Sequence, residues 1–200
     1  LLLAPAFLLG GVVGSKLMLV LIGALVIPVA WAAVGAFTQQ HWARLAITGV
    51  VALGCPLLYS VGQVYPDVTA GVIVLLGLTW LLIGNGNRPA WQSVPVAASL
   101  AFLPWLQVKF AAPAIVLTLA LAWLWRRTHR MLAGGSVVAL TVSLGLLAAF
   151  NTHAYGSVTG AYVDGGLTLS PTALMVLFGL FLDQNQGLLM LNPVLWAAVP

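Results

Sequence analysis

The sequence predicts an all-α bundle of membrane-spanning helices, and three observations lead to this prediction. Hydrophobic residues make up 62% of the 200 residues and charged residues only 5%, whereas a soluble domain carries about a quarter charged residues. The mean hydropathy is +1.10. Several runs without an ionised side chain approach the roughly 20 apolar residues that a helix needs to cross the hydrocarbon core; they include 17–31, 68–83 and 111–125. We therefore expect an integral, multi-pass protein of the plasma membrane.

Hydropathy divides the chain into about seven or eight membrane segments. Complete spans are expected at 17–36, 45–60, 67–84, 93–106, 110–125 and 131–150, with a partial span at the start and another near the end. Prolines in or beside these spans predict kinks or helix starts, because proline has no N–H to donate within a helix. The segment 171–183 is too short to span at about 1.5 Å per residue, so we expect either an amphipathic helix in the outer interface or a re-entrant piece.

The beginning of the chain predicts a fragment of a larger membrane domain. The first residue is Leu, and the apolar stretch 1–13 runs directly into the next span with no basic region or cleavage site before it. A signal peptide requires both. We expect residues 1–200 to form part of a single transmembrane domain, truncated at its N-terminus and continuing beyond residue 200.

Arginines fall in every second connection, which predicts the orientation of the bundle. They are Arg44, Arg88, Arg126, Arg127 and Arg130. Cytoplasmic loops carry an excess of Lys and Arg, so these connections face the cytoplasm and the others face outward. The outward connections are 61–66, 107–109 and 151–170, and Asp67, Lys109, His153 and Asp164 belong to that side. Polar residues are therefore expected at an extracytoplasmic rim.

Asp67 is the first residue at this rim that could carry chemistry. It follows Pro66 at the predicted start of a helix, where proline fits the first turn and an acid complements the helix dipole. That structural role is one interpretation. The other is that Asp67 faces a water-filled space as a base, or binds a cation or a sugar hydroxyl. Gln63 and Tyr65, in the polar segment just before it, are expected to line the same space.

Lys109 has two comparable interpretations. It lies between two apolar spans, and its ammonium group can extend to the lipid headgroups. Alternatively, it holds a phosphate leaving group at the outer mouth of the bundle, where a compact cation stabilises developing negative charge. An ion pair between Asp67 and Lys109 is a third arrangement that the sequence leaves open.

The segments after residue 150 contain further candidates for lining a substrate site. They are His153, Tyr155, Asp164 and Asp183. The loop from 151 to 170 is rich in Gly, Ser, Thr and Tyr, which suits hydrogen bonding to a sugar but is also ordinary for a solvated connection.

Other classes of site are excluded by what the sequence lacks. Three dispersed His and one Cys give no metal-ligand spacing, so no metal site is assigned. No nucleotide-binding or hydrolase motif is present. The arginines at 126–130 form too short a basic patch for nucleic acid, and we interpret them as a topology anchor.

Three ordered segments resemble the GT-C class of polytopic glycosyltransferases, especially actinobacterial-like members that use polyprenyl-phosphate sugars. The segment 56–67, with Gln63-Val64-Tyr65-Pro66-Asp67, resembles their helix start at the extracytoplasmic face. The segment 103–110 resembles their basic-aromatic helix opening, and Lys109-Phe110 supplies those residues. The stretch 151–194, with Tyr155-Gly156-Ser157 and Gly179 to Asp183, resembles their Tyr-Gly-Ser loop and the motif after it.

The resemblance implies transfer of a sugar from a polyprenyl phosphate to a glycan or lipid-linked acceptor of the cell envelope, at the extracytoplasmic face. It implies that the main catalytic acid precedes Leu1, that Asp67 is a secondary carboxylate and that Lys109 contacts the donor phosphate. No cofactor is assigned, although a divalent cation is compatible with this chemistry. The chain contains no Glu, so family members with a glutamate at these positions are not matched.

Two other functions compete with the glycosyltransferase. A transporter or flippase would place charged residues deep within spans or on discontinuous helices. A non-catalytic scaffold would use Gly10, Gly11 and Gly14 only for close helix packing, and it predicts no cavity that joins Asp67 to Lys109.

Overall fold

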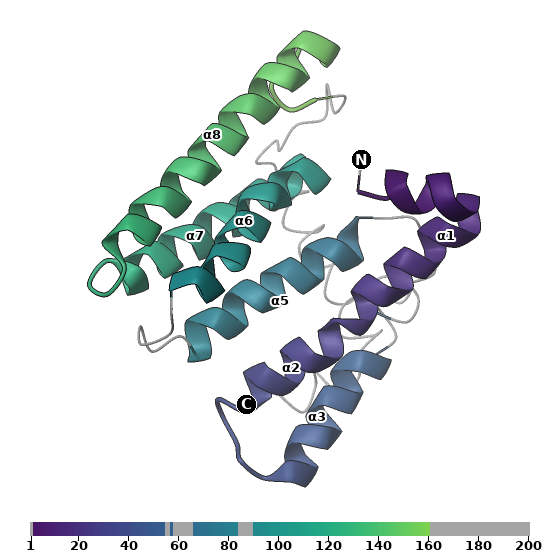
Figure 1. Cartoon of the computed structure of the whole chain (residues 1–200), viewed down its shortest axis with the longest axis vertical. Helices are drawn as coiled ribbons and strands as arrows, with labels where there is room; N and C mark the ends of the chain where they lie inside the picture. Colours follow the sequence, from purple (N-terminus) through teal and green to yellow (C-terminus); the bar gives the residue numbers. More distant parts are fainter. Residues whose placement is uncertain (1, 55–56, 58–65, 84–89, 161–200) are drawn as a thin grey trace, which may run out of the picture.

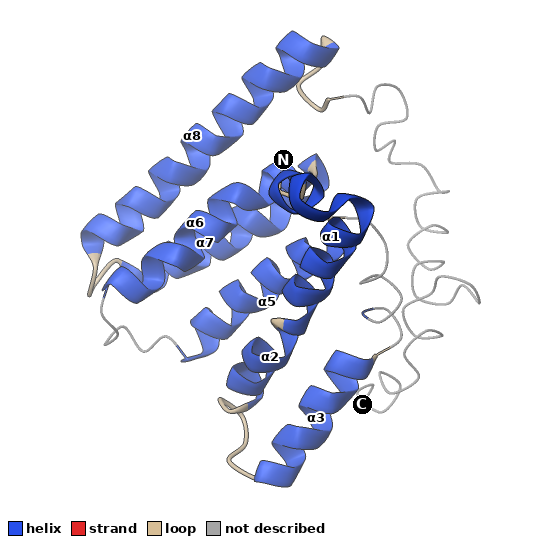
Figure 2. Ribbon diagram, turned by 45° about the vertical axis from the view of Figure 1, so that its right-hand side comes forward, coloured by secondary structure: helices blue, strands red, loops and turns tan. Residues whose placement is uncertain are grey.

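The protein consists of helices joined by loops in the part of the chain that the computed structural model describes, residues 2–54, 57, 66–83 and 90–160. Figure 2 shows helices and loops in these ranges, which confirms the all-α prediction. The elements are α1 (Ala4–Ala24), α2 (Val26–Val34), α3 (His41–Leu53), α5 (Asp67–Ile83), α6 (Ala90–Leu106), the 3₁₀ turn η1 (Val108–Phe110), α7 (Ala111–Trp125) and α8 (Arg130–Tyr155).

The sequence predicts a partial span at 1–13 followed by a separate span from residue 17. In the structure both lie in one apolar stretch, Ala4–Val34, whose backbone is not helical at Gly10 and Gly11. The break therefore lies a few residues before the expected boundary. A second boundary occurs at Leu25, between α1 and α2. It lies near Pro28, which has no N–H to donate to the carbonyl four residues earlier.

A sharp change of direction occurs within α1, at Gly10 and Gly11. Gly11 has φ +57° and ψ −142°, a conformation that residues with a Cβ rarely adopt. The turns before this break lie across the axis of the rest of α1 (Figure 1). They fold back so closely that a Cβ on Gly14 would overlap the carbonyl oxygen of Ala6. These glycines therefore shape α1 itself.

The helices form a continuous series of neighbours. Helix α8 packs on α6 and α7, helix α5 packs on α6, α7 and α2, and α3 packs on α2; Figure 1 shows α8 and α3 on opposite flanks. The main core lies between α6, α7 and α8, with Leu103 and Leu121 completely buried. Gly77 lets α5 approach this core, since a Cβ there would lie 3.1 Å from the Leu117 side chain.

Three of the described helical stretches are long and apolar enough to cross a membrane, judged by length and composition. They are Ala4–Val34, Val108–Trp125 and Arg130–Tyr155, and α3 and α5 are shorter apolar helices. Large apolar side chains also cover the surface, as Leu9 and Met131 illustrate with 91% and 92% exposure. Such a surface suits lipid as the surrounding solvent. These helices fit a membrane protein.

The two ends of the bundle carry different residues. The connections 35–40 and 126–129 lie on the lower-left side in Figure 1, together with the arginines beside them; we call this the arginine end. The start of α5, the turn η1 and the loop 156–160 lie on the opposite, upper-right side. We call this the pair end, for the ion pair described below. This segregation agrees with the alternation predicted from the arginines.

Candidate functional site at the pair end

Asp67 is positioned by the first turn of α5. The carbonyl oxygen of Pro66 accepts a hydrogen bond from the Ala70 N–H at 2.9 Å, so the helix starts at the proline and aspartate. An acid at this position complements the positive end of the helix dipole. The structural role predicted for Asp67 is therefore present, and its carboxylate is held at the surface of the bundle.

Lys109 is positioned by a short interruption between α6 and α7. Helix α6 ends before Gln107, whose backbone is extended at φ −159° and ψ 146°. The single turn η1 follows, with the Phe110 N–H donating to the Gln107 carbonyl at 3.0 Å. The Lys109 ammonium lies 4.9 Å from the centroid of the Phe110 ring. The interruption directs the cation away from the apolar helix that follows.

Asp67 and Lys109 form an ion pair. The distance between Lys109 Nζ and Asp67 Oδ1 is 2.8 Å, and the two side chains are 58% and 46% exposed, respectively. The prediction that the two residues lie on the same side of the bundle is thus confirmed, and the mutual pair is the arrangement observed. An exposed pair of this kind contributes only about 0.2–1 kcal/mol to stability. Folding therefore does not depend on it, and its ammonium group is accessible to an anion.

The loop after α8 is held against the bundle by Asn151. Helix α8 ends at a left-handed Gly156, with φ +70°, whose N–H donates to the Thr152 carbonyl. The buried Asn151 amide then donates to the Val158 carbonyl at 3.0 Å. A Cβ placed on Gly160 would lie 3.5 Å from the Asn151 side chain, so the loop packs closely on this residue. These contacts bring residues 156–160 back toward the α6–α7 connection.

A hydrogen bond between α6 and α8 fixes the helices beneath this loop. The indole Nε1 of Trp105 donates to Ser143 Oγ at 2.9 Å, and Ser143 in turn donates to the Ala101 carbonyl. The Trp105 ring also contacts Phe150, with 6.3 Å between centroids. The residue just before the α6–α7 connection is therefore anchored to α8.

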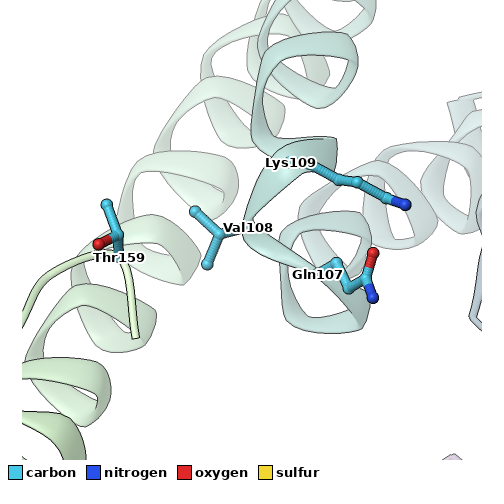
Figure 3. A pocket seen from close by; sticks show the side chains of 4 residues that line it. All are labelled: Gln107, Val108, Lys109 and Thr159. Carbon is cyan, nitrogen blue, oxygen red and sulfur yellow. The ribbon is translucent and has the colours of Figure 1, made fainter. Parts of the chain in front are cut away.

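A cavity of about 420 Å³ lies where the loop meets the connection. Its described lining residues are Gln107, Val108, Lys109 and Thr159. Figure 3 shows Val108 directed toward Thr159, whereas Gln107 and Lys109 extend away from Thr159. Val108 thus presents an apolar side chain toward Thr159, and the donors of Gln107 and Lys109 lie on the opposite side of the connection. Asp67 is connected to it through Lys109.

The remaining predicted site residues fall into two groups. His153 and Tyr155 lie in the last turn of α8, both exposed, but neither is among the described residues that line the cavity. Tyr155 instead makes an edge contact with Phe150. Four others lie outside the described residues: Gln63, Tyr65, Asp164 and Asp183.

Two lining residues, Gln107 and Thr159, were not singled out from the sequence. A signal existed for Gln107, because it is a polar residue two positions before Lys109 between apolar helices. No local signal identifies Thr159, since its position depends on how Asn151 folds the loop back. Within the described ranges, no group of three or more His, Cys, Asp or Glu could hold a metal ion.

Comparison of the chain with protein-family models, with curated proteins and with solved structures finds no match. Function is therefore inferred from the residues and from the geometry of the pair end.

Proposed function

We propose that this chain is part of a GT-C-type membrane glycosyltransferase with seven or eight membrane segments in these 200 residues. It transfers a sugar from a polyprenyl-phosphate donor to a cell-envelope acceptor, a glycan or a lipid-linked sugar, at the extracytoplasmic face of the plasma membrane. The observation that carries the proposal is the exposed Asp67–Lys109 pair beside the cavity of about 420 Å³. The resemblance of the three ordered segments supports the assignment to this class.

In this proposal, the donor phosphate replaces Asp67 as the partner of Lys109. The donor phosphodiester carries one negative charge, as the Asp67 carboxylate does, and it can replace that carboxylate because the exposed pair is weak. The polyprenyl phosphate that leaves gains further negative charge, which the Lys109 ammonium stabilises. The Gln107 amide, which extends in the same general direction as Lys109 in Figure 3, supplies a second donor. The polyprenyl chain then lies against the apolar helices, where lipid surrounds the protein.

The transfer reaction needs one cation, which stabilises the leaving phosphate, and one base, which accepts a proton from the acceptor. The bond between the sugar C1 and the phosphate oxygen breaks, and Lys109 stabilises the charge that develops on that oxygen. The acceptor oxygen bonds to C1, and its proton passes to a carboxylate. In this proposal, the main carboxylate is supplied by sequence before Leu1. Asp67 lines the site as a secondary acid that is released when the phosphate engages Lys109.

The test measures sugar transfer from a labelled polyprenyl-phosphate donor by the full-length protein in proteoliposomes. We expect Lys109→Ala to lower kcat/KM by about 10²-fold, as loss of one charge-stabilising donor does. Lys109→Arg should retain part of the activity because it keeps the positive charge. Lys16→Gln, which removes an exposed cation on a different helix, α1, should leave activity unchanged.

A charge reversal separates a reactive pair from a purely structural one. The double variant Asp67→Lys/Lys109→Asp retains an ion pair between α5 and η1 but exchanges the two groups. We expect the double variant to fold like the wild type and to have no sugar-transfer activity. Full activity in the double variant, or in both Asp67→Asn and Lys109→Ala, would remove these residues from the reaction.

A further inference from the structure

The arginine end carries a second site, independent of the glycosyltransferase proposal. Helix α7 ends at Trp125, which is only 2% exposed. The N–H groups of Thr128 and His129 donate to the Trp125 carbonyl at 3.1 and 2.7 Å. This tight turn holds the residues 126–130 at the surface of the bundle, so the exposed side chains of Arg126, Arg127 and Arg130 project from a fixed backbone.

An open cavity of about 500 Å³ lies at this turn. Its described lining residues are Arg127, Thr128, His129, Arg130, Met131 and Leu132. Arg126 is placed differently, with its guanidinium carbon 3.3 Å from the centroid of the Trp123 ring. Two arginines therefore line the cavity, and the third is stacked beside it.

The charge of this cavity is not balanced by acidic side chains of the described chain. Asp67 is the acid within the described ranges, and it is paired with Lys109 at the opposite end. The first turn of α8 contains no acidic residue. The positive potential at the arginine end is thus available to an external anion.

Exposed apolar side chains flank the turn on both sides. Trp123 is 67% exposed one turn before it, and Met131 is 92% exposed at its other edge. Tryptophan is enriched where the hydrocarbon meets the headgroup layer. A ligand here would have its anionic group among the arginines and an apolar portion beside Trp123 and Met131. This combination matches an anionic phospholipid better than a free, fully soluble anion.

We propose that the cavity between α7 and α8 binds the headgroup of an anionic phospholipid of the surrounding bilayer. Arg127 and Arg130 hold the phosphodiester, and the acyl chains lie along the exposed apolar faces of α7 and α8. Basic pockets between membrane helices are suited to such headgroups. The site would make the turn between α7 and α8 a specific lipid contact as well as a determinant of orientation.

The test counts lipids retained by the purified full-length protein in native mass spectrometry, after exchange into detergent with equimolar phosphatidylglycerol and phosphatidylcholine. We expect preferential retention of phosphatidylglycerol by the wild type. Arg127→Gln/Arg130→Gln should reduce that preference by about 25-fold, at about fivefold for each arginine near an anionic membrane surface. Lys16→Gln, a charge loss at a distant exposed site, should not change it.

A double lysine variant and a competition experiment with inorganic phosphate complete the test. Arg127→Lys/Arg130→Lys preserves both charges and should retain most of the preference, so it tests the site even if the glutamine variant fails to fold. Added inorganic phosphate should compete only weakly, because it has no acyl chains. Equal retention of both lipids by the wild type, an unchanged preference in the folded glutamine variant, or complete displacement by inorganic phosphate would overturn the proposal.

Discussion

Arg44 and the Asp67–Lys109 pair, which lie at opposite ends of the bundle, use their charges in different ways. At the arginine end, Arg44 is half buried: its Nη2 donates to the Trp31 carbonyl at 2.9 Å, and its guanidinium carbon lies 4.2 Å from the centroid of the Trp31 ring. At the pair end, Asp67 and Lys109 are exposed and contact each other. The first arrangement joins α2 to α3. The second contributes little to folding and is free to exchange partners, which is the property that a binding site requires.

The most decisive prediction concerns the side of the membrane that each end faces. In a Cys55→Ser background, Ser157→Cys at the pair end should react with a membrane-impermeant maleimide in intact cells. Thr128→Cys at the arginine end should react only after the membrane is permeabilised, because arginine-rich loops stay in the cytoplasm. Labelling of both positions from outside, or of Thr128→Cys alone, would reverse or abolish the proposed orientation.

A second prediction compares the stability that Arg44 and Lys109 contribute to the protein. Arg44→Ala should lower the free energy of unfolding by about 2–3 kcal/mol, since it removes a charged hydrogen bond and a cation–π contact. Lys109→Ala should lower it by less than about 1 kcal/mol. Equilibrium unfolding in mixed detergent micelles measures both. Equal losses of unfolding free energy in the two variants would contradict the distinction between Arg44 and Lys109.

A third prediction tests how the cavity wall at the pair end is built. Asn151→Ala removes the hydrogen bond to the Val158 carbonyl and should destabilise the protein by about 1–3 kcal/mol. Protease cleavage within 156–160 should become faster because the loop loses its attachment. Thr152→Ala, whose exposed hydroxyl bonds only to the carbonyl of Ala148 within its own helix, is the matched control. Its expected effect is within about 0.5 kcal/mol.

Much of the fold could be predicted because it follows from local sequence. The apolar runs predict helices, and Pro66-Asp67 marks the start of α5 as expected. The arginine pattern separates the two ends correctly within the described ranges. The first helix is broken at Gly10 and Gly11, a few residues before the expected boundary. Hydropathy alone does not show where an apolar stretch turns, and the backbone conformation of these two glycines decides the position.

The candidate site was less predictable because it depends on contacts between distant segments. The sequence placed Asp67 and Lys109 on one side but left their pairing open. Thr159 lines the same cavity as Lys109, and the loop that carries it is held by the hydrogen bond from Asn151 to the Val158 carbonyl. The sequence places Asn151 only at the start of the stretch 151–194, and its role in holding the loop follows from the fold.

The break at Gly10 and Gly11 has a consequence for how the first helix fits a bilayer. A straight helix of the 31 residues Ala4–Val34 would be about 46 Å long, well beyond a hydrocarbon thickness of about 30 Å. Such hydrophobic mismatch is relieved by tilting, by kinking or by thickening the bilayer. Because the turns before Gly10 lie across the axis, the crossing portion is shorter. The segment can then rest along the interface, where its angle adjusts the helix to membranes of different thickness.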